Sequence, residues 1–352
     1  MGSIAVPQTV KQWNVVSHNG FDGLKFSEQP LPELGDSQVL VKLEGASLNY
    51  RDLIIARGEY PFGVAPNVIP GSDGAGTVVS VGKHVTRFRP GDKVITLFNQ
   101  GHLGGSLTPQ SVATGTGGVL DGTFRNYGAF SEEALVRCPS HLTPVEAATL
   151  TCAGLTAWNA LFGSADHVVR AGHWVLVQGT GGVSIFALQF AKAVGAKVIA
   201  TTGSPDKVPL LKKLGADHVL NYKEDPSWGQ TAKGLTGGRG VDHVVQVAGA
   251  KEMEQSIAAV KMDGIIDIIG FVGGTADKEP GFLQCLSNLF TARGILVGSR
   301  TQMEEMLEAI EAHPEALRPV VDQKVFKLEE LKEAYEYQWS GKHFAKVCVK
   351  IE

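Results

Sequence analysis

The sequence predicts an α/β protein made of a β-rich part and a doubly wound parallel sheet. Residues 1–98 contain short alternating or β-branched runs that glycine and proline interrupt, which is typical of strands in a bent sheet. In residues 174–300, short apolar runs alternate with amphipathic helical patterns, which indicates parallel strands covered by helices. The 352 residues, 43% of them hydrophobic, suffice for two domains with separate cores.

The β-rich part is predicted from alternation and from turn residues. A helical or irregular segment is expected at 46–57. Residues 99–128 are rich in Gly, Ser and Thr and have almost no periodic pattern, so we expect a long loop that is either functional or disordered. Its aromatic residues Phe124 and Tyr127, with Phe130 after it, either form part of a pocket wall or anchor the loop. The expected strands are 9–16, 24–28, 38–44, 74–82, 93–97 and 130–137.

The parallel sheet is predicted from six short apolar runs with helices between them. A helix is expected at 143–165, where Pro144 follows Thr143 and Glu146 completes a capping-box pattern. A further helix is expected at 301–312, and the tail is expected to rejoin the first domain. The expected strands are 174–178, 197–201, 218–221, 243–246, 264–269 and 295–298, the helices between them include 206–214 and 252–259, and the tail segments are 325–327, 331–340 and 346–351.

A glycine-rich turn follows the first strand of this sheet. Gly179, Gly181 and Gly182 lie between strand 174–178 and a helix at 183–194. In such a unit the glycines let the backbone approach a dinucleotide pyrophosphate, and free N–H groups at the helix N-terminus receive its charge. Ser184 replaces the third glycine of the usual motif, and the alternative is a glycine-rich turn in another kind of α/β protein. The predicted cofactor contacts here are Gly179, Thr180, Gly181, Gly182 and Val183.

The net charge and the cysteine content indicate which classes of partner and which cellular compartment to expect. The net charge is −4 and no basic stripe is present, so we expect neither nucleic acid nor a membrane as a partner. The four cysteines are scattered without a Cys-x-x-Cys pair, which favours a reducing compartment. The sequence has no signal-peptide pattern and no apolar run of about 18 residues. We therefore expect a cytoplasmic protein with a small-molecule substrate.

Several motifs in chain order resemble those of one superfamily, and the likeness covers nearly the whole chain. The chain resembles the medium-chain dehydrogenase/reductase superfamily, and within it the zinc-independent quinone oxidoreductases, enoyl reductases and zinc-lacking alcohol dehydrogenase-like proteins. The resemblance implies a GroES-like catalytic domain at 1–138 and 308–352, a Rossmann NADP-binding domain at 139–307, and an active site in the cleft between them. Besides the glycine-rich turn, the matching stretches are Leu48-Asn49-Tyr50-Arg51-Asp52, Gly71-Ser72-Asp73-Gly74-Ala75-Gly76, Pro90-Gly91-Asp92-Lys93-Val94, Ala153-Gly154-Leu155-Thr156-Ala157-Trp158 and Leu214-Gly215-Ala216-Asp217-His218-Val219.

The resemblance also implies which positions a zinc ion would use. Asn49 and Ser72 stand where zinc-dependent relatives have a cysteine and a histidine, Asp73 stands at the neighbouring glutamate, and only Cys152 matches a ligand. A catalytic zinc needs three protein ligands, and residues 99–128, where the structural zinc lobe would lie, contain no cysteine. We therefore expect no metal, and interpret Cys152 as a buried apolar thiol.

Tyr60 is the first candidate for catalysis. The stretch Arg57-Gly58-Glu59-Tyr60 resembles the Gln-Gly-x-Tyr stretch whose tyrosine donates the proton in zinc-free enoyl thioester reductases, although Arg57 departs from that pattern. A proton source and a hydrogen-bond donor are what an enolate intermediate needs. The alternative is that Tyr60 is buried beside Pro61 as a hinge.

Asn49 is the second catalytic candidate. It occupies the vacated zinc-ligand position, and its amide is expected to bond the nicotinamide ribose or the substrate oxygen. For the neighbouring Arg51 and Asp52, a structural ion pair or a helix-end cap is the favoured interpretation.

The end of strand 197–201 decides the choice of cofactor. NAD-selective sites place Asp or Glu there for the ribose hydroxyls, whereas this chain has no carboxylate before Asp206. Ser204 and Lys207 are therefore expected to bind a 2′-phosphate, with Lys207 as a point charge, and Thr202 is expected to contact the cofactor. Tyr222 resembles the family tyrosine that flanks the adenosine phosphate. We predict NADPH rather than NADH; the alternative for Lys207 is an exposed helix lysine.

Residues after the later strands complete the predicted cofactor site. Ala248, Ile269 and Phe271 end the fourth and fifth strands and are expected beside the nicotinamide, because ligands lie beyond the carboxyl ends of parallel strands. Ser299 follows the sixth strand and is expected to reach the cofactor, with packing or interface roles as alternatives. Residues 282–298 are the expected homodimer contact, since the family pairs sheet edges across a two-fold axis.

The sequence thus predicts a zinc-independent, NADPH-dependent oxidoreductase that transfers hydride to an activated C=C bond in an enone, quinone or enoyl substrate. One alternative is an NAD(P)-dependent alcohol dehydrogenase or carbonyl reductase. Another, of a different class, is a non-catalytic dinucleotide-binding sensor.

Overall fold

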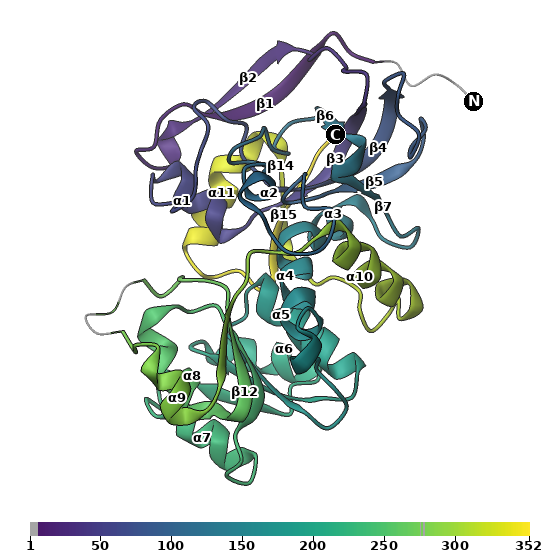
Figure 1. Cartoon of the computed structure of the whole chain (residues 1–352). Helices are drawn as coiled ribbons and strands as arrows, with labels where there is room; N and C mark the ends of the chain where they lie inside the picture. The colour runs from purple at the N-terminus through teal and green to yellow at the C-terminus, as the bar shows by residue number, and fades with distance from the viewer. Residues whose placement is uncertain (1–5, 275, 277–278) are drawn as a thin grey trace. The chain divides into compact units, whose positions relative to one another are not determined.

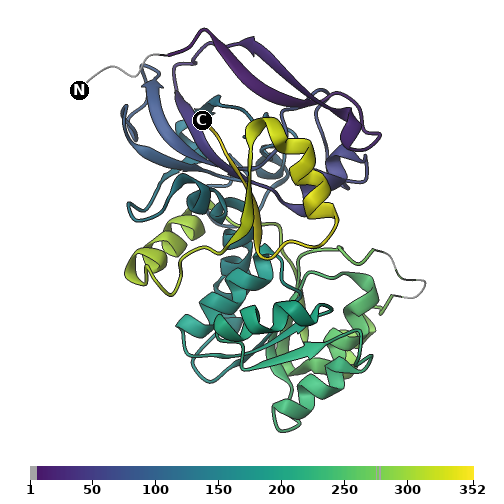
Figure 2. The same ribbon diagram turned by 180° about the vertical axis from the view of Figure 1, so that it is seen from behind.

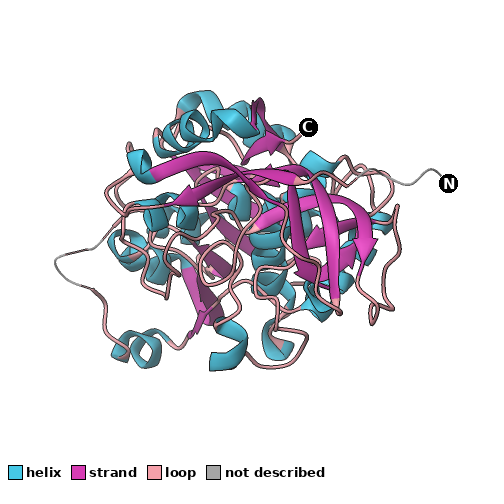
Figure 3. Ribbon diagram, turned by 90° about the horizontal axis from the view of Figure 1, so that it is seen from above, coloured by secondary structure: helices cyan, strands magenta, loops and turns pink. Residues whose placement is uncertain are grey.

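A computed structural model describes residues 6–274, 276 and 279–352 of the chain, with the helices and strands shown in Figure 1 and distinguished by colour in Figure 3. The chain divides into two compact units. The first unit is Met1–Cys152, Gly298–Pro314 and Arg318–Glu352, and the second is Ala153–Val297 with Glu315–Leu317.

The first unit is built on a seven-stranded sheet in the order β14-β15-β3-β4-β5-β7, with β6 also paired to β3. A separate antiparallel hairpin of β1 and β2 belongs to the same unit. The strands are β1 (Thr9–Val15), β2 (Leu24–Pro30), β3 (Gln38–Ser47), β4 (Asp73–Val81), β5 (Lys93–Thr96), β6 (Tyr127–Ser131), β7 (Leu135–Arg137), β14 (Val321–Lys327) and β15 (Lys346–Lys350), and the helices are α1 (Tyr50–Ala56), α2 (Pro109–Val112), α3 (Pro144–Ala148), α10 (Arg300–Ala312) and α11 (Leu331–Trp339).

The tail of the chain rejoins the first unit, as the sequence predicts. Strand β15 pairs antiparallel with β3, with Cys348 opposite Ser47, and α11 packs on both β14 and β15. These yellow C-terminal elements are seen from behind in Figure 2. The pairing places the start of β15 next to the end of β3, from which the loop to α1 continues.

The long segment 99–128 is ordered rather than featureless. It contains α2, and a bridge between Asn99 and Gly115 closes its first half. Phe124 is fully buried and lies edge-on to Tyr335, with ring centroids 6.2 Å apart. Phe124 therefore anchors the loop in the hydrophobic core, which leaves it no place in a pocket wall.

The second unit is a six-stranded sheet in the order β10-β9-β8-β11-β12-β13, with every pair parallel. This order reverses between β8 and β11, the arrangement that binds dinucleotides at the carboxyl ends of the strands. The strands are β8 (Trp174–Gln178), β9 (Lys197–Thr202), β10 (His218–Asn221), β11 (Val241–Gln246), β12 (Val260–Ile268) and β13 (Thr291–Gly294), and the helices are α4 (Leu155–Phe162), α5 (Gly182–Ala193), α6 (Val208–Lys213), α7 (Trp228–Leu235), α8 (Met253–Ala259) and α9 (Leu283–Asn288).

Three element predictions are wrong in detail. The sixth strand is β13 rather than 295–298, because pairing with β12 ends at Gly294 and Val297 has a left-handed φ of 54° that extended backbone excludes. The predicted helix 143–165 is broken into α3, a π-helical turn at Leu150–Gly154, and α4. The Thr149 hydroxyl donates to the Glu146 carbonyl at 2.6 Å, at the end of α3. Strand 130–137 is likewise divided into β6 and β7 by a turn at Glu132–Ala134.

The compact units differ from the predicted domain bounds at three places, one of which is Glu315–Leu317, assigned to the second unit. Residues 139–152 belong to the first unit because α3 packs on β3. The packing is close, since a Cβ added to Gly45 of β3 would lie 2.4 Å from the carbonyl oxygen of Pro144 in α3. Residues 298–307 belong there too, since Arg300 pairs with Glu133 and α10 packs on β7. Among the described residues, no helix combines the length and apolar content that crossing a membrane requires.

Candidate active site

The glycine-rich turn has the backbone geometry that a pyrophosphate needs. Gly179 has a φ of 74°, a conformation that L side chains rarely adopt. Apart from the adjoining residues of the chain, no described atom lies within 4 Å of the Cβ position of either Gly179 or Gly181, so the space beside the turn is open. Gly181 precedes the twelve-residue helix α5, and the N–H groups in the first turn of a helix have no partner within the helix. A dinucleotide pyrophosphate therefore fits this turn; Thr180 and Val183 flank it.

Ser184 has a role in place of the missing third glycine. Its side chain is fully buried, and its hydroxyl donates to the carbonyl oxygen of Gln178 at 2.6 Å. The hydroxyl thereby ties the first turn of α5 to the end of β8. The departure from the glycine motif is thus compatible with the tight turn.

Gln178 links the two central strands at the point where the strand order reverses. Its Oε1 accepts hydrogen bonds from the backbone N–H groups of Val247 and Ala248, both at 3.2 Å. Its Nε2 donates to Ser256 Oγ at 2.9 Å. This side chain was not among the predicted site residues, although a lone glutamine at the end of an apolar strand is a signal of such a role. The arrangement holds Ala248, a predicted cofactor contact, beside the end of β8.

Ile269 and Phe271 follow β12 on the same edge of the sheet. The Ile269 N–H donates to the Gln246 carbonyl at 2.9 Å. The Cα of Phe271 would lie 2.7 Å from a Cβ on Gly249, and the Phe271 side chain is 43% exposed. The three segments after β8, β11 and β12 thus meet at the carboxyl edge, where the sequence predicts the nicotinamide.

The end of β9 carries the residues that the sequence predicts to face the adenosine half of a dinucleotide. The Thr202 hydroxyl accepts from the Ser204 N–H at 3.2 Å. A Cβ on Gly203 would lie 2.6 Å from Tyr222 Oη and 2.8 Å from Lys223 Cε, so both side chains cover this glycine. The contact of Tyr222 with a cofactor stays a prediction, and Lys223 was not among the predicted residues because charged residues on a surface loop are common. Lys207 lies in the turn before α6 and is half-buried.

The side chain of Ser299 forms its hydrogen bond within the first unit. It is the N-cap of α10: its hydroxyl accepts from the Gln302 N–H at 3.3 Å, and its own N–H donates to Gln302 Oε1 at 2.9 Å. The residue is 3% exposed. These contacts agree with the alternative that Ser299 has a packing role, and its contact with the cofactor stays a prediction.

Tyr60 is held by Arg51. Arg51 Nε donates to Tyr60 Oη at 3.3 Å, and the guanidinium carbon lies 5.1 Å from the centroid of the Tyr60 ring. Arg51 is itself fixed, since its NH1 donates to the Thr116 carbonyl at 2.9 Å and lies 3.5 Å from Asp52 Oδ1. The predicted Arg51–Asp52 ion pair is confirmed, but the role of Arg51 toward Tyr60 was missed. Arg57 instead pairs with Glu59.

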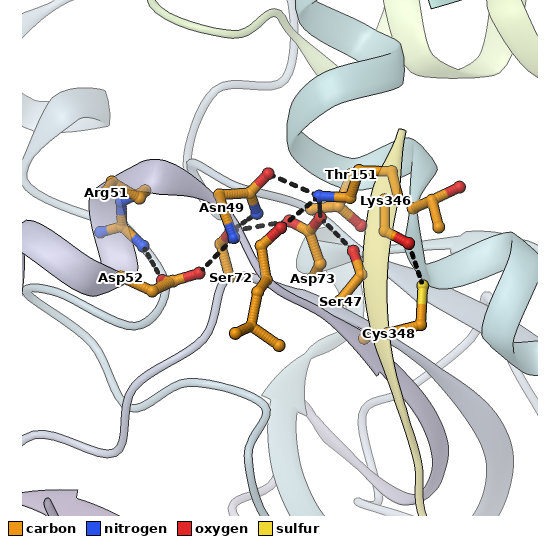
Figure 4. A network of polar contacts seen from close by, with 12 residues as sticks. Ser47, Asn49, Arg51, Asp52, Ser72, Asp73, Thr151, Lys346 and Cys348 are labelled. Atoms are coloured by element: carbon orange, nitrogen blue, oxygen red, sulfur yellow. Dashed lines mark hydrogen bonds and ion pairs between the residues drawn. The ribbon is translucent and has the colours of Figure 1, made fainter. Parts of the chain in front are cut away.

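Asn49 lies in a network of polar side chains at the start of α1 (Figure 4). Its backbone N–H donates to Asp52 Oδ2 at 2.8 Å, which confirms the predicted helix-end cap. Its Oδ1 accepts from Lys346 Nζ at 2.6 Å, and its Nδ2 donates to Ser72 Oγ at 3.3 Å. Lys346 was missed, because a lysine in the alternating segment 346–351 gives no sign that it is buried.

The donor set at the implied zinc position does not fit a zinc ion. The Ser72 hydroxyl donates to Asp73 Oδ1 at 2.7 Å, and the Lys346 ammonium lies 2.6 Å from Asn49 Oδ1 and 3.2 Å from Asp73 Oδ2. Cys152, whose thiol pKa burial raises to about 12, is the single zinc-ligand residue type among Asn49, Ser72 and Cys152, whereas a catalytic zinc needs three protein ligands. Within the described part of the chain, no three His, Cys, Asp or Glu side chains are grouped to hold a metal.

Comparison with known proteins gives the family. Residues 35–140 match the alcohol dehydrogenase GroES-like domain, and residues 182–312 match the family described as zinc-binding dehydrogenase. A zinc-type alcohol dehydrogenase-like protein of Schizosaccharomyces pombe is 48% identical over 338 residues, which are 95% of this chain and 97% of that protein.

Solved structures agree with this assignment. A structure described as an NAD-dependent alcohol dehydrogenase is 32% identical, with a TM-score of 0.86 over 97% of this chain and 100% of that chain. A crotonyl-CoA carboxylase/reductase is 27% identical, with a TM-score of 0.86 over 98% of this chain and 89% of that chain. Both domains and nearly the whole length are matched. The chain therefore belongs to the medium-chain dehydrogenase/reductase family, and is an oxidoreductase of a family that depends on a nicotinamide dinucleotide.

Proposed function

We propose that this protein is a zinc-independent, NADPH-dependent reductase of activated C=C bonds in enones, quinones or enoyl compounds. The observation that carries the proposal is the hydrogen bond from Arg51 Nε to Tyr60 Oη. Because the phenol oxygen accepts from a cation, its own O–H remains available to donate. A held tyrosine with a free proton is what protonation of an enolate requires.

In the proposed reaction, bound NADPH would supply a hydride to the β-carbon of the substrate. The C=C π electrons then move to the carbonyl oxygen, which becomes an enolate oxygen. Asn49 donates a hydrogen bond to that oxygen, where negative charge develops. Tyr60 O–H protonates the α-carbon, and the positive charge of Arg51 stabilises the phenolate until solvent returns the proton.

The preference for NADPH rests on the end of β9. This segment has no carboxylate before the exposed Asp206, and Lys223 covers Gly203 together with Tyr222. A lysine ammonium is a common phosphate partner, whereas an acidic residue here would favour NADH. Ser204 and Lys207 complete the proposed 2′-phosphate site.

The homodimer contact is proposed at 282–298. Phe282, Leu283 and Leu286 are 93%, 75% and 70% exposed, and an apolar patch of this kind is typical of an interface. Strand β13 forms the edge of its sheet next to this patch in sequence. A cytoplasmic location is proposed from the four cysteines, all of which are free thiols.

Alcohol or carbonyl redox chemistry is the second candidate, because relatives of this chain carry the name alcohol dehydrogenase. The test mixes purified protein with NADPH or NADH and a panel of enones, quinones, enoyl thioesters, aldehydes and alcohols. Oxidation of NADPH by enones or quinones supports the proposal. Turnover of aldehydes or alcohols alone favours the second candidate, and tight NADPH binding with no turnover favours a sensor.

A further inference from the structure

A closed ring of hydrogen bonds surrounds the Asn49 side chain (Figure 4). Lys346 Nζ donates to Asn49 Oδ1 at 2.6 Å and to Asp73 Oδ2 at 3.2 Å. Asn49 Nδ2 donates to Ser72 Oγ at 3.3 Å, and the Ser72 hydroxyl donates to Asp73 Oδ1 at 2.7 Å. Since an ammonium only donates and a carboxylate only accepts, the ring fixes the amide with its oxygen toward Lys346.

All three protons of the Lys346 ammonium are engaged. The third is donated to the carbonyl oxygen of Leu48 at 2.7 Å. Lys346 is only 2% exposed, and Asp73 is fully buried, where it also accepts from Ser47 Oγ at 2.7 Å. Lys346 thus has no free proton for a substrate, and any effect that it has on chemistry passes through its partners.

Asn49 is half-buried and keeps one amide proton for a ligand. A primary amide has two N–H donors; Ser72 accepts one, and no acceptor among the residues that the structure describes takes the other. A cation on the amide oxygen withdraws electron density from the nitrogen, so the remaining N–H becomes a stronger donor. The amide of Asn49 is therefore both oriented and polarised.

We propose that Lys346 is a positioning residue that makes Asn49 the oxyanion donor of the active site. The inference rests on the proposed function, because the oxygen in question is the carbonyl oxygen that becomes an enolate when hydride adds to the β-carbon. The positive charge of Lys346 acts on that oxygen through the amide of Asn49. The buried ammonium of Lys346 thus stabilises the negative charge on the substrate oxygen, a role that a zinc ion cannot take here because the side chains present do not fit one.

The first experiment is a double-mutant cycle in kcat. Lys346→Met is combined with Asp73→Asn, so that no charge is left buried without a partner. We expect Asn49→Ala and the K346M/D73N variant each to lower kcat about 100-fold, as loss of one oxyanion donor does. The KM for NADPH should change less than about twofold, because the variants remove an interaction made in the transition state and not one that binds NADPH in the ground state.

The triple variant decides whether Lys346 acts through Asn49. We expect its kcat to be within about threefold of that of Asn49→Ala, because residues that act as a unit are non-additive. Lys350→Met, which removes an exposed lysine from the same strand, should leave kcat unchanged. Additive losses in the triple variant, or an unchanged kcat in K346M/D73N, would overturn the inference.

A spectroscopic measurement separates this inference from the proposed function. In protein with isotopically labelled asparagine, the Asn49 side-chain NH2 signals are identified by their loss in Asn49→Ala. We expect these proton signals to move upfield in K346M/D73N and to stay unchanged in Lys350→Met. If the wild-type protein reduces no substrate, the proposed function fails, while the shift still tests the polarised amide; unmoved signals contradict the inference even in an active enzyme.

Discussion

The guanidinium of Arg51 contacts Tyr60 in two ways, through a hydrogen bond to the phenol oxygen and through a cation–π contact with the ring. Arg51 Nε donates to Tyr60 Oη at 3.3 Å, and the guanidinium carbon lies 5.1 Å from the ring centroid. The hydrogen bond takes a lone pair of the oxygen, and the cation sits against the electron-rich ring. The phenol is thereby positioned to lose a proton, which motivates the first prediction.

Tyr60→Phe is expected to lower kcat for an enone at least about tenfold, a barrier increase of about 1.4 kcal/mol. The substitution removes the proton donor and keeps the ring that packs near Arg51. Stopped-flow or steady-state oxidation of NADPH measures the effect. Tyr127→Phe, at a half-buried tyrosine of β6, serves as the control, and an unchanged rate in Tyr60→Phe would remove this residue from the mechanism.

Lys223→Ala is expected to weaken NADPH binding about tenfold, or about 1.4 kcal/mol, and to leave NADH binding unchanged. The reason is that Lys223 lies over Gly203 at the end of β9, where only NADPH would carry a phosphate. Calorimetric titration with both cofactors measures the difference. Lys212→Ala, an exposed lysine of α6, is the matched control; equal losses for NADPH and NADH in Lys223→Ala would refute the phosphate contact.

The buried Asp52 is expected to make folding stability fall as the pH rises from about 4 to 6. Burial raises the pKa of Asp52 to about 6, despite the opposing charge of Arg51. The folded state therefore holds this proton more tightly than the unfolded state does. The contribution is fully present below the unfolded pKa of about 4 and is lost as the pH passes the folded value, an effect on the order of 3 kcal/mol.

Asp52→Asn tests this pH dependence, since the amide oxygen still accepts from the Asn49 N–H and carries no charge. The free energy of unfolding from urea titrations should exceed that of the wild-type protein by more at pH 7 than at pH 4. Glu59→Gln, at a half-exposed surface carboxylate, provides the comparison. A constant difference between Asp52→Asn and wild type across this range would show that Asp52 does not titrate as stated.

Phe282→Asp combined with Leu286→Asp is expected to convert a homodimer into a monomer. These side chains are 93% and 70% exposed in the single chain, and two added carboxylates would be buried at a pairing interface. Light scattering after size exclusion gives the mass. Val16→Asp, at an exposed valine of the first unit, should keep the wild-type mass; a wild-type protein that is already monomeric contradicts the proposed contact.

Local sequence was enough to predict the dinucleotide part of the fold. Strand β8 lies at the predicted residues, and the turn after it depends on the φ of Gly179. Such features follow from the period of apolar residues and from the backbone freedom of glycine, which act over a few neighbours. Even Ser184, a departure from the motif, forms its hydrogen bond to a residue only six positions away.

The environment of Asn49 could be decided only by tertiary structure. Lys346 is 297 positions away, and it reaches Asn49 because β15 pairs with β3 in one register. The burial of Phe124 against Tyr335 depends likewise on two distant segments. The periodicity of a sequence indicates which residues are buried. It does not indicate which buried residues contact one another, because sheet register and the packing of distant segments set the distances between them. The sequence by itself thus determined the family, the glycine-rich turn and the positions a zinc ion would have used, whereas the fold determined that a buried lysine pairs with the asparagine at one of them.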